Sequence, residues 1–163
     1  MTYKPPYTIT SKILNLSTKI SEELANLKFN SSSKAIPMLR KKNRIKTLAG
    51  TLEIEGNFLG VDKITAILEG KRVLATVSEL AEVKGAIKAY NKLDEYRFDN
   101  IDDLLYAHKI LMNEILNTAG NFRSVNVQVG VHIAPQANMV NDLMEKLFSW
   151  LENSDEHMLL KSC

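Results

Sequence analysis

The stretch AGNFRSVNVQVGV, residues 119–131, marks the point where the chain changes from a helical to an extended pattern. Its second half alternates valine with small or polar residues, in the order Val125, Asn126, Val127, Gln128, Val129, Gly130 and Val131. A period of two is typical of a strand, and no other segment shows it clearly. Because a lone strand is not stable, we expect it to pair with a short neighbour around His132 and Ile133, or to lie as a flap on helices.

The segments on both sides of this stretch have the three-and-four spacing of amphipathic helices. Thr10 or Ser11 can cap a first helix, and Pro37 suits the first turn of a second one, which Gly56-Asn57 ends. Further starts and stops are predicted at the stop Gly70, the capping box Thr76-Val77-Ser78-Glu79, the cap Asn100, the stop Gly120, the start after Pro135 and the cap Ser154-Asp155. The sequence therefore predicts a mostly α fold with one short β-hairpin.

The composition is that of one globular domain. The chain has 163 residues, of which 45% are apolar and 25% are charged, an ordinary balance for a soluble protein. Its single cysteine, Cys163, excludes an intramolecular disulfide and a cysteine-based zinc cluster, and with three scattered histidines we expect no metal site. No apolar run approaches the ~20 residues of a membrane helix, and the first residues lack a secretory signal. We therefore expect a cytoplasmic protein without a membrane segment.

Basic residues are concentrated in the first third of the chain, although the net charge is only +2. Residues 1–50 carry ten Lys or Arg against two Asp or Glu, a balance of +8, and residues 51–163 carry eleven against seventeen, a balance of −6. The densest run, Arg40 to Lys46, is either a patch for phosphate or nucleic acid or the solvated face of a helix. No aromatic residue interleaves the run for base stacking, so we rank nucleic-acid binding last.

The sequence contains none of the common nucleotide-binding or catalytic motifs. It has no G-x-x-x-x-G-K-[ST], G-x-G-x-x-G, H-E-x-x-H or G-x-S-x-G segment. His108 lies on the apolar face of its helix and is interpreted as a satisfied core histidine. Glu53 and Glu55 are two residues apart on a helix, so they point to different sides and form no catalytic pair. We therefore assign no catalytic, cofactor-binding or metal-binding residue.

One glutamate has an unusual position. Thr51 and Glu55 are four residues apart, share a helix face with Leu48, and stand at the end of the helix. The helix dipole opposes a carboxylate there by about 0.3–1 kcal/mol. Glu55 is therefore either an exposed acid on a frayed turn, which the residues alone favour, or a partner for an arginine from elsewhere.

The last residues, Met158 to Cys163, begin an apolar helix without a stop signal. This segment is either a short terminal helix that frays or the start of a helix in a domain that continues. The residues alone leave both interpretations open, and the second one means a fold that is incomplete at the C-terminus.

The order of several short motifs resembles the Fic family, whose members transfer AMP from ATP to a hydroxyl group of a target protein. Thr51-Leu52-Glu53-Ile54-Glu55-Gly56 is similar to the family's inhibitory-helix pattern, [S/T]-x-x-x-E-[G/N]. The other matching segments are Ile67–Gly70, Glu79–Val83, Ala107–Met112, Ala119–Arg123, Val127–Gly130, Ala134-Pro135, Leu143–Leu151 and Leu159–Cys163. The resemblance extends from about Tyr7 to Cys163 and implies a Fic-like helical bundle with a flap.

The chain departs from the family at the segment that carries the chemistry. The motif H-P-F-x-[D/E]-G-N-G-R-x-x-R is absent; in complete relatives it comes shortly after the position of Cys163. In the family it supplies the general base, the acid that holds Mg²⁺ and the arginines that hold the phosphates of ATP, and phosphoryl-type transfer depends on such groups. Smaller departures are Gln136, where relatives often have proline, and Gly60, where they commonly have a threonine cap.

The resemblance also implies roles for two groups of residues and a division of the chain. The inhibitory residues would be Thr51, Glu55, Gly56 and Asn57, with Glu55 pairing with the last arginine of the family motif and so blocking the γ-phosphate site. The flap, at about residues 123–135, would hold a target peptide by strand addition through Val125, Asn126, Val127, Gln128 and Val129. Residues 1–57 would form the N-terminal helices, including the inhibitory helix, and residues 58–163 the first part of a Fic-like domain.

Two functions follow as expectations. The first is an inactive, truncated regulatory and target-binding portion of a Fic-type adenylyltransferase. We expect no cofactor in this chain, whereas the resemblance implies ATP and Mg²⁺ for complete family members. The alternative is a binding module that restrains a complete Fic protein in trans through its inhibitory helix. The expected partners are accordingly a target protein or a complete Fic protein.

Overall fold

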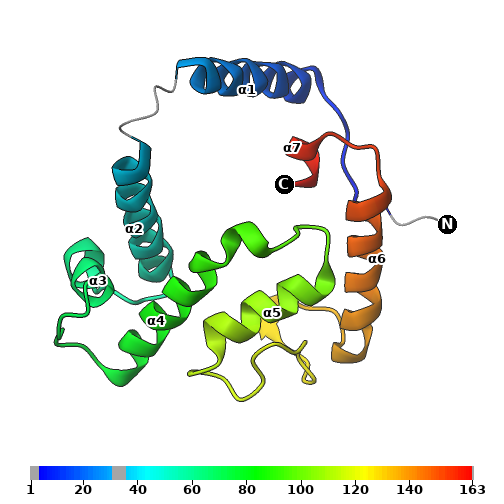
Figure 1. Ribbon diagram of the computed structural model, residues 1–163. Helices are drawn as coiled ribbons and strands as arrows, with labels where there is room; N and C mark the ends of the chain where they lie inside the picture. The colour runs from blue at the N-terminus through cyan, green and yellow to red at the C-terminus, as the bar shows by residue number, and fades with distance from the viewer. Residues whose placement is uncertain (1–3, 31–35, 163) are drawn as a thin grey trace.

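The computed structural model describes residues 4–30 and 36–162, which form helices joined by short loops and one hairpin (Figure 1). In chain order the elements are α1 (Ser11–Asn30), α2 (Ile36–Ile54), α3 (Gly60–Leu68), α4 (Val77–Asn91), η1 (Leu93–Glu95), α5 (Ile101–Met112), β1 (Gln128–Val129), β2 (His132–Ile133), η2 (Ala137–Met139), α6 (Val140–Asn153) and α7 (Met158–Lys161). The two strands pair antiparallel. This arrangement confirms the predicted mostly α fold with one short hairpin.

Three predicted helix starts are confirmed by their cap hydrogen bonds. Thr10 directly precedes α1, and its Oγ1 accepts a hydrogen bond from the backbone N–H of Ile13 at 3.2 Å. Thr76 and Glu79 form the predicted capping box of α4, and the Asn100 side chain accepts from the backbone N–H of the third residue of α5. These side chains satisfy backbone donors that a helix leaves unpaired at its start.

The capping box gives a pH-dependent expectation. Hydrogen bonds from the backbone and side chain of Thr76 lower the pKa of the Glu79 carboxyl. Because this pKa is lower in the folded state, the stabilisation is present above the unfolded value and is lost as pH falls through the folded value. We expect an NMR titration to place Glu79 below an ordinary glutamate, and Thr76→Val to raise its pKa part of the way back. An unchanged titration in Thr76→Val would contradict this cause.

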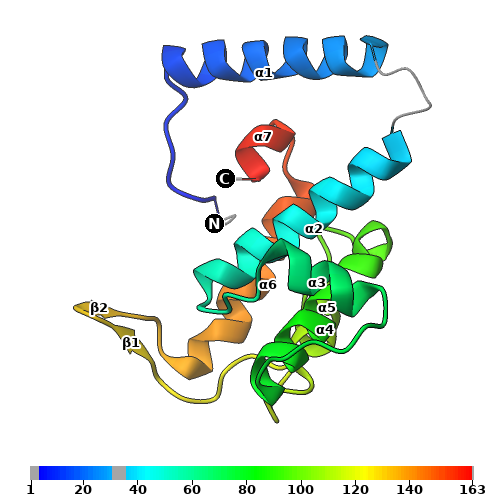
Figure 2. The same cartoon turned by 90° about the vertical axis from the view of Figure 1, so that its left-hand side faces the viewer.

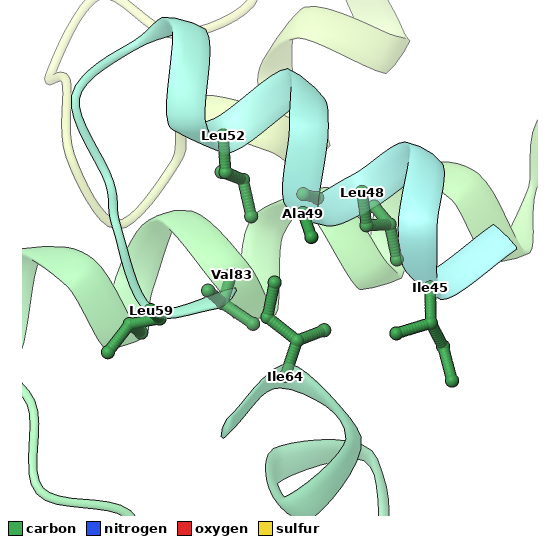
Figure 3. Close-up of a cluster of buried hydrophobic side chains, with 8 residues drawn as sticks. Ile45, Leu48, Ala49, Leu52, Leu59, Ile64 and Val83 are labelled. Carbon is green, nitrogen blue, oxygen red and sulfur yellow. The ribbon is translucent and has the colours of Figure 1, made fainter. Parts of the chain in front are cut away.

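Helices α2, α3 and α4 pack around one apolar cluster (Figure 3). Its buried members are Ile45, Leu48, Ala49, Leu52, Leu59, Ile64, Val83 and Ala86. Ile64, from α3, is only 1% exposed and points between the other two helices. The cluster contains residues on both sides of the expected boundary between 57 and 58, so it holds the end of α2 in a fixed place.

Two predicted helix boundaries are wrong. The fifth helix ends at Met112, not at Gly120, because residues 113–120 form successive turns before Gly120 adopts a positive φ of 82°. Ser154 is not an N-cap: it ends α6, and its N–H donates to Trp150 O at 2.9 Å. Helix α7 begins three residues after Asp155, and His157 caps it by accepting from Leu159 N–H at 3.2 Å. A cap must directly precede its helix, so Ser154 is too early.

Helix α1 lies apart from the other helices. It extends across the side of the molecule above α7, and the hairpin β1–β2 projects from the opposite end (Figures 1 and 2). Its apolar residues stay largely exposed, including Leu16 at 49% and Leu24 at 51%. None of the helices in the described ranges has the length and hydropathy that crossing a membrane requires.

Candidate regulatory and target-binding site

The end of α2 forms a hydrogen-bonded helix stop. Asn57 N–H donates to Leu52 O at 2.9 Å and Gly56 N–H donates to Glu53 O at 3.0 Å, the paired bonds of a Schellman motif. Gly56 has a φ of 89°, and an added Cβ would contact nothing within 4 Å. Glycine is therefore favoured here for its backbone conformation and not for lack of space. The predicted helix stop at Gly56 is confirmed.

Asn57 fastens this stop to α4. Its side chain is buried, at 2% exposure; its Nδ2 donates to Glu82 Oε2 at 2.8 Å and to Glu79 O at 3.1 Å, and its Oδ1 accepts from Leu59 N–H at 3.3 Å. Every polar atom of the side chain is thus used within the fold. Asn57 therefore positions the end of α2 and does not share the exposed surface of Thr51 and Glu55.

Thr51 and Glu55 line one open cavity of about 480 Å³ between α2, α4 and α5. Other polar groups on its wall come from Glu82, Tyr90 and His108, and the remaining lining residues are apolar: Leu48, Leu52, Ala86, Leu111, Met112 and Ile115. The wall therefore carries two carboxylates and neither lysine nor arginine. Such a cavity suits a cation, above all a guanidinium that can bind a carboxylate through two N–H groups.

Glu55 is exposed and forms no ion pair with another described residue. It follows the last residue of α2, where the helix dipole adds no support for a negative charge. Its cavity also contains the carboxylate of Glu82, which is bound to Asn57 and to Ser78 Oγ at 3.3 Å. Glu55 is thus the carboxylate of this cavity that is open to a partner.

His108 brings α5 to the same cavity. Its Nδ1 accepts from Gly120 N–H at 3.1 Å, so the neutral ring carries its proton on Nε2. Gly120 has a φ of 82°, and a Cβ there would lie 2.8 Å from Lys109 Cβ. The histidine is half-buried and lines the cavity, so it is not the enclosed core histidine that the sequence predicts.

The hairpin carries the second group of predicted site residues. Gln128 pairs with Ile133 and Val129 with His132, and Gly130, with a φ of 57°, is the first residue of the two-residue turn. The strands are shorter than the predicted alternation over Val125–Val131. Both are exposed on each face, and Val131 is 99% exposed. Within the described residues each strand therefore has one free edge.

Arg123 and Asn126 hold the base of the hairpin. The Arg123 guanidinium donates to Val125 O at 2.8 Å and also to Pro135 O, so one side chain joins the two arms. Asn126 Oδ1 accepts from Ala137 N–H at 2.8 Å. Asn126 is thus directed to the helix after the hairpin, which leaves the backbone of β1 as the group that a peptide could pair with.

Replacing Arg123 with lysine tests this clamp. A single ammonium group lacks the planar fork that reaches both carbonyls, so we expect the backbone N–H of Ala134, which donates to Val127 O at 3.3 Å, to exchange several-fold faster. The melting temperature should change little, because the hairpin is exposed. Arg72→Lys on the loop before α4 is the matched control. Equal exchange in both variants would contradict the clamp.

Comparison with known proteins supplies the family. The Fic/DOC family profile matches residues 98–163, which contain α5, the hairpin, α6 and α7. A crystal structure of a Fic family protein from Desulfovibrio desulfuricans G20 superposes with a TM-score of 0.87, is 39% identical, and covers 99% of this chain. Residues 98–163 match the Fic/DOC family, and the chain as a whole has the fold of a Fic family protein. The predicted resemblance is confirmed.

The chain spans only part of the length of the relatives it matches. It covers 51% of the Desulfovibrio chain. A protein adenylyltransferase Fic from Culex quinquefasciatus is 28% identical over 128 residues, which are 74% of this chain and 25% of that protein. The end of α2, which carries Thr51 and Glu55, precedes the segment that the family profile matches, whereas the Culex match and the structural match both extend over it.

The sequence did not point to Glu82, Tyr90 or Arg123 as site residues. Glu82 is three residues after Glu79 on α4, and nothing in the spacing distinguishes it from a solvated acid. The sequence indicated Arg123 only as a residue of the segment that resembles the start of the family's flap. These residues enter the site through the packing of α2 on α4 and the return of the chain at Pro135.

Proposed function

We propose that this chain is a regulatory and target-binding portion of a Fic-type protein adenylyltransferase. The observation that carries the proposal is the placement of Glu55, unpaired and exposed, on an acidic cavity at the end of a helix fixed by Asn57. The name of the Culex relative supports adenylyl transfer as the activity of the whole protein. The free edge of the hairpin supports peptide binding by strand addition.

The residues present do not fit nucleotide chemistry by themselves. The cavity that holds Glu55 contains two carboxylates and no basic residue, which repels a triphosphate. No group of three His, Cys, Asp or Glu that could hold a metal ion occurs within the described ranges. The chain also lacks the H-P-F-x-[D/E]-G-N-G-R segment. We therefore infer that its contribution is inhibition and target contact, and that the catalytic groups lie outside these residues.

The first test is direct. The 163-residue chain, incubated with labelled ATP, Mg²⁺ and candidate target proteins, is expected to transfer no AMP. Labelled protein above a control without the chain would refute the proposed division of roles.

A second candidate function is restraint of a complete Fic protein in trans. The specific observation in its favour is that Glu55 is exposed, while the apolar cluster between α2, α3 and α4 fixes the helix that precedes it. In this proposal its carboxylate accepts two hydrogen bonds from a guanidinium of the complete enzyme, and such desolvated pairs are worth about 1.5 kcal/mol or more.

The chain offers a matched control for this role. Glu53 is an exposed glutamate two residues earlier on α2 that does not line the cavity. We expect the wild-type chain and Glu53→Ala to lower AMP transfer by the Culex enzyme about tenfold, and Glu55→Ala to leave it unrestrained. Equal inhibition by both variants would overturn the role of Glu55.

A further inference from the structure

The hairpin turns one set of backbone groups outward on each strand. Gln128 lies opposite Ile133, and the N–H of Ala134 donates to the carbonyl oxygen of Val127 at 3.3 Å. In an antiparallel ladder the backbone groups of neighbouring residues point to opposite edges of a strand. Because the carbonyl of Val127 points to β2, the N–H and C=O of Gln128 point to the free edge of β1, and those of Ile133 point to the free edge of β2.

The edge of β2 is poorly suited to pair with a further strand. The next residue on that edge after Ile133 is Pro135, which has no N–H to donate, and its carbonyl oxygen accepts from the guanidinium of Arg123. Proteins also protect strand edges with proline or charged side chains, and residues 124–134 contain no proline, lysine, arginine, aspartate or glutamate. The edge of β1 is therefore the one that is open to pairing.

The polar side chains along β1 are bonded within the chain. Asn126 Oδ1 accepts from a backbone N–H of η2 at 2.8 Å, and Gln128 Nε2 donates to the carbonyl oxygen of the first turn residue at 2.7 Å. The side chains left open beside the edge are those of Val127 and Val129, which are 40% and 76% exposed. They share one face, because side chains alternate along a strand. A strand added here would therefore meet β-branched, apolar side chains on that face.

These groups define the kind of sequence that fits the edge. We propose that the free edge of β1 takes an extended target segment in which two β-branched, apolar residues flank the residue that pairs with Gln128. The paired residue accepts from the Gln128 N–H and donates to the Gln128 C=O. Its two neighbours lie beside Val127 and Val129, where apolar cross-strand pairs stabilise a sheet. A charged neighbour would find no Lys, Arg, Asp or Glu on the hairpin strands.

This inference rests on target binding by the hairpin, which is part of the proposed function, and adds the sequence that the hairpin selects. NMR titration of the isotope-labelled chain with three synthetic peptides tests it. The first peptide carries Val-Thr-Val within an uncharged Gly/Ser sequence, the second carries Asp-Thr-Asp in the same sequence, and the third is the first with an N-methyl group on threonine.

We expect the first peptide to bind about fivefold more tightly than either of the others. The second peptide lacks the apolar pairs, and the third lacks the donor to the Gln128 C=O. The first peptide should also slow the exchange of the Gln128 N–H and leave that of the Ile133 N–H unchanged.

Two exposed valines of the hairpin give a matched pair of variants. Val129→Lys should weaken binding of the first peptide about fivefold, because it removes one apolar pair and adds a charge. Val131→Lys should change the affinity less than about twofold, since Val131 is 99% exposed in the turn and outside the ladder. Both positions are exposed, so the melting temperatures of the two variants should match that of the wild type.

The possible failures separate this inference from the proposed function. Equal affinity for the first two peptides, equal effects of the two lysine variants, or protection of the Ile133 N–H in place of the Gln128 N–H would overturn the inference while leaving target binding by the hairpin in place. Binding of none of the peptides, or pairing of two copies of the chain along β1, would count against both. Affinity and exchange rate need neither ATP nor Mg²⁺, so the test for AMP transfer is independent of this one.

Discussion

Replacing Gly85 with alanine is expected to destabilise the chain by about 3 kcal/mol or more, at the upper end of overpacking effects. A Cβ at Gly85 would lie 2.1 Å from the carbonyl oxygen of Leu111 and 3.0 Å from its carbonyl carbon. These are backbone atoms of α5, so no side chain can rotate away. Helices α4 and α5 would have to separate, which opens the cavity wall that Glu82 and His108 share.

Gly50 provides the matched control for this substitution. It is an exposed glycine inside α2, and a Cβ there meets nothing within 4 Å. Gly50→Ala should gain up to about 1 kcal/mol from helix propensity, whereas Gly85→Ala should lose stability despite the same gain. Urea denaturation followed by circular dichroism measures both. A Gly85→Ala variant as stable as the wild type would show that α4 and α5 do not pack as closely as described.

The local signals of the sequence were sufficient for the helix order. The caps at Thr10, Thr76 and Asn100 and the stop at Gly56 act within five residues along the chain, so they can be predicted without knowledge of the fold. The same holds for the pairing of the valine segment with His132 and Ile133. Its length was overestimated because alternation predicts a half-buried strand, whereas both strands of the hairpin are exposed and only Gln128 and Val129 form β1.

The contacts that build the site could not be predicted from the sequence. Asn57 was predicted to end a helix and, from the family resemblance, to be an inhibitory residue. Its burial against α4 depends on how α2 crosses that helix, which the sequence does not show. Gly85 carried no signal either, because its need for space comes from Leu111, 26 residues later in the sequence. Thr51 and Glu55 were correctly placed on one face, but their common cavity also requires α4 and α5. Their inhibitory role stays a prediction.

Asn57→Asp is the second substitution with a large expected effect. The side chains have the same shape, but the Nδ2 donor, which is 2.8 Å from Glu82 Oε2 and 3.1 Å from Glu79 O, becomes an acceptor facing two acceptors. The site is 2% exposed, so water cannot screen the new charge beside Glu82. Uncompensated buried charges cost about 3–5 kcal/mol, and we expect a loss of that size at neutral pH in urea denaturation.

Acid and a second substitution should each relieve this loss. Free Asp and Glu bind protons near pH 4, and one proton between the two carboxyls restores a donor, so the deficit should shrink as pH falls to that range and grow again as pH rises. Glu82→Gln, added to Asn57→Asp, reverses donor and acceptor and should recover most of the stability at pH 7. If Asn57→Asp is as stable as the wild type, or if the double variant is no better than the single one, the bond between Asn57 and Glu82 does not hold the end of α2. Glu55, two residues earlier, would then lack the fixed position on which its proposed role depends.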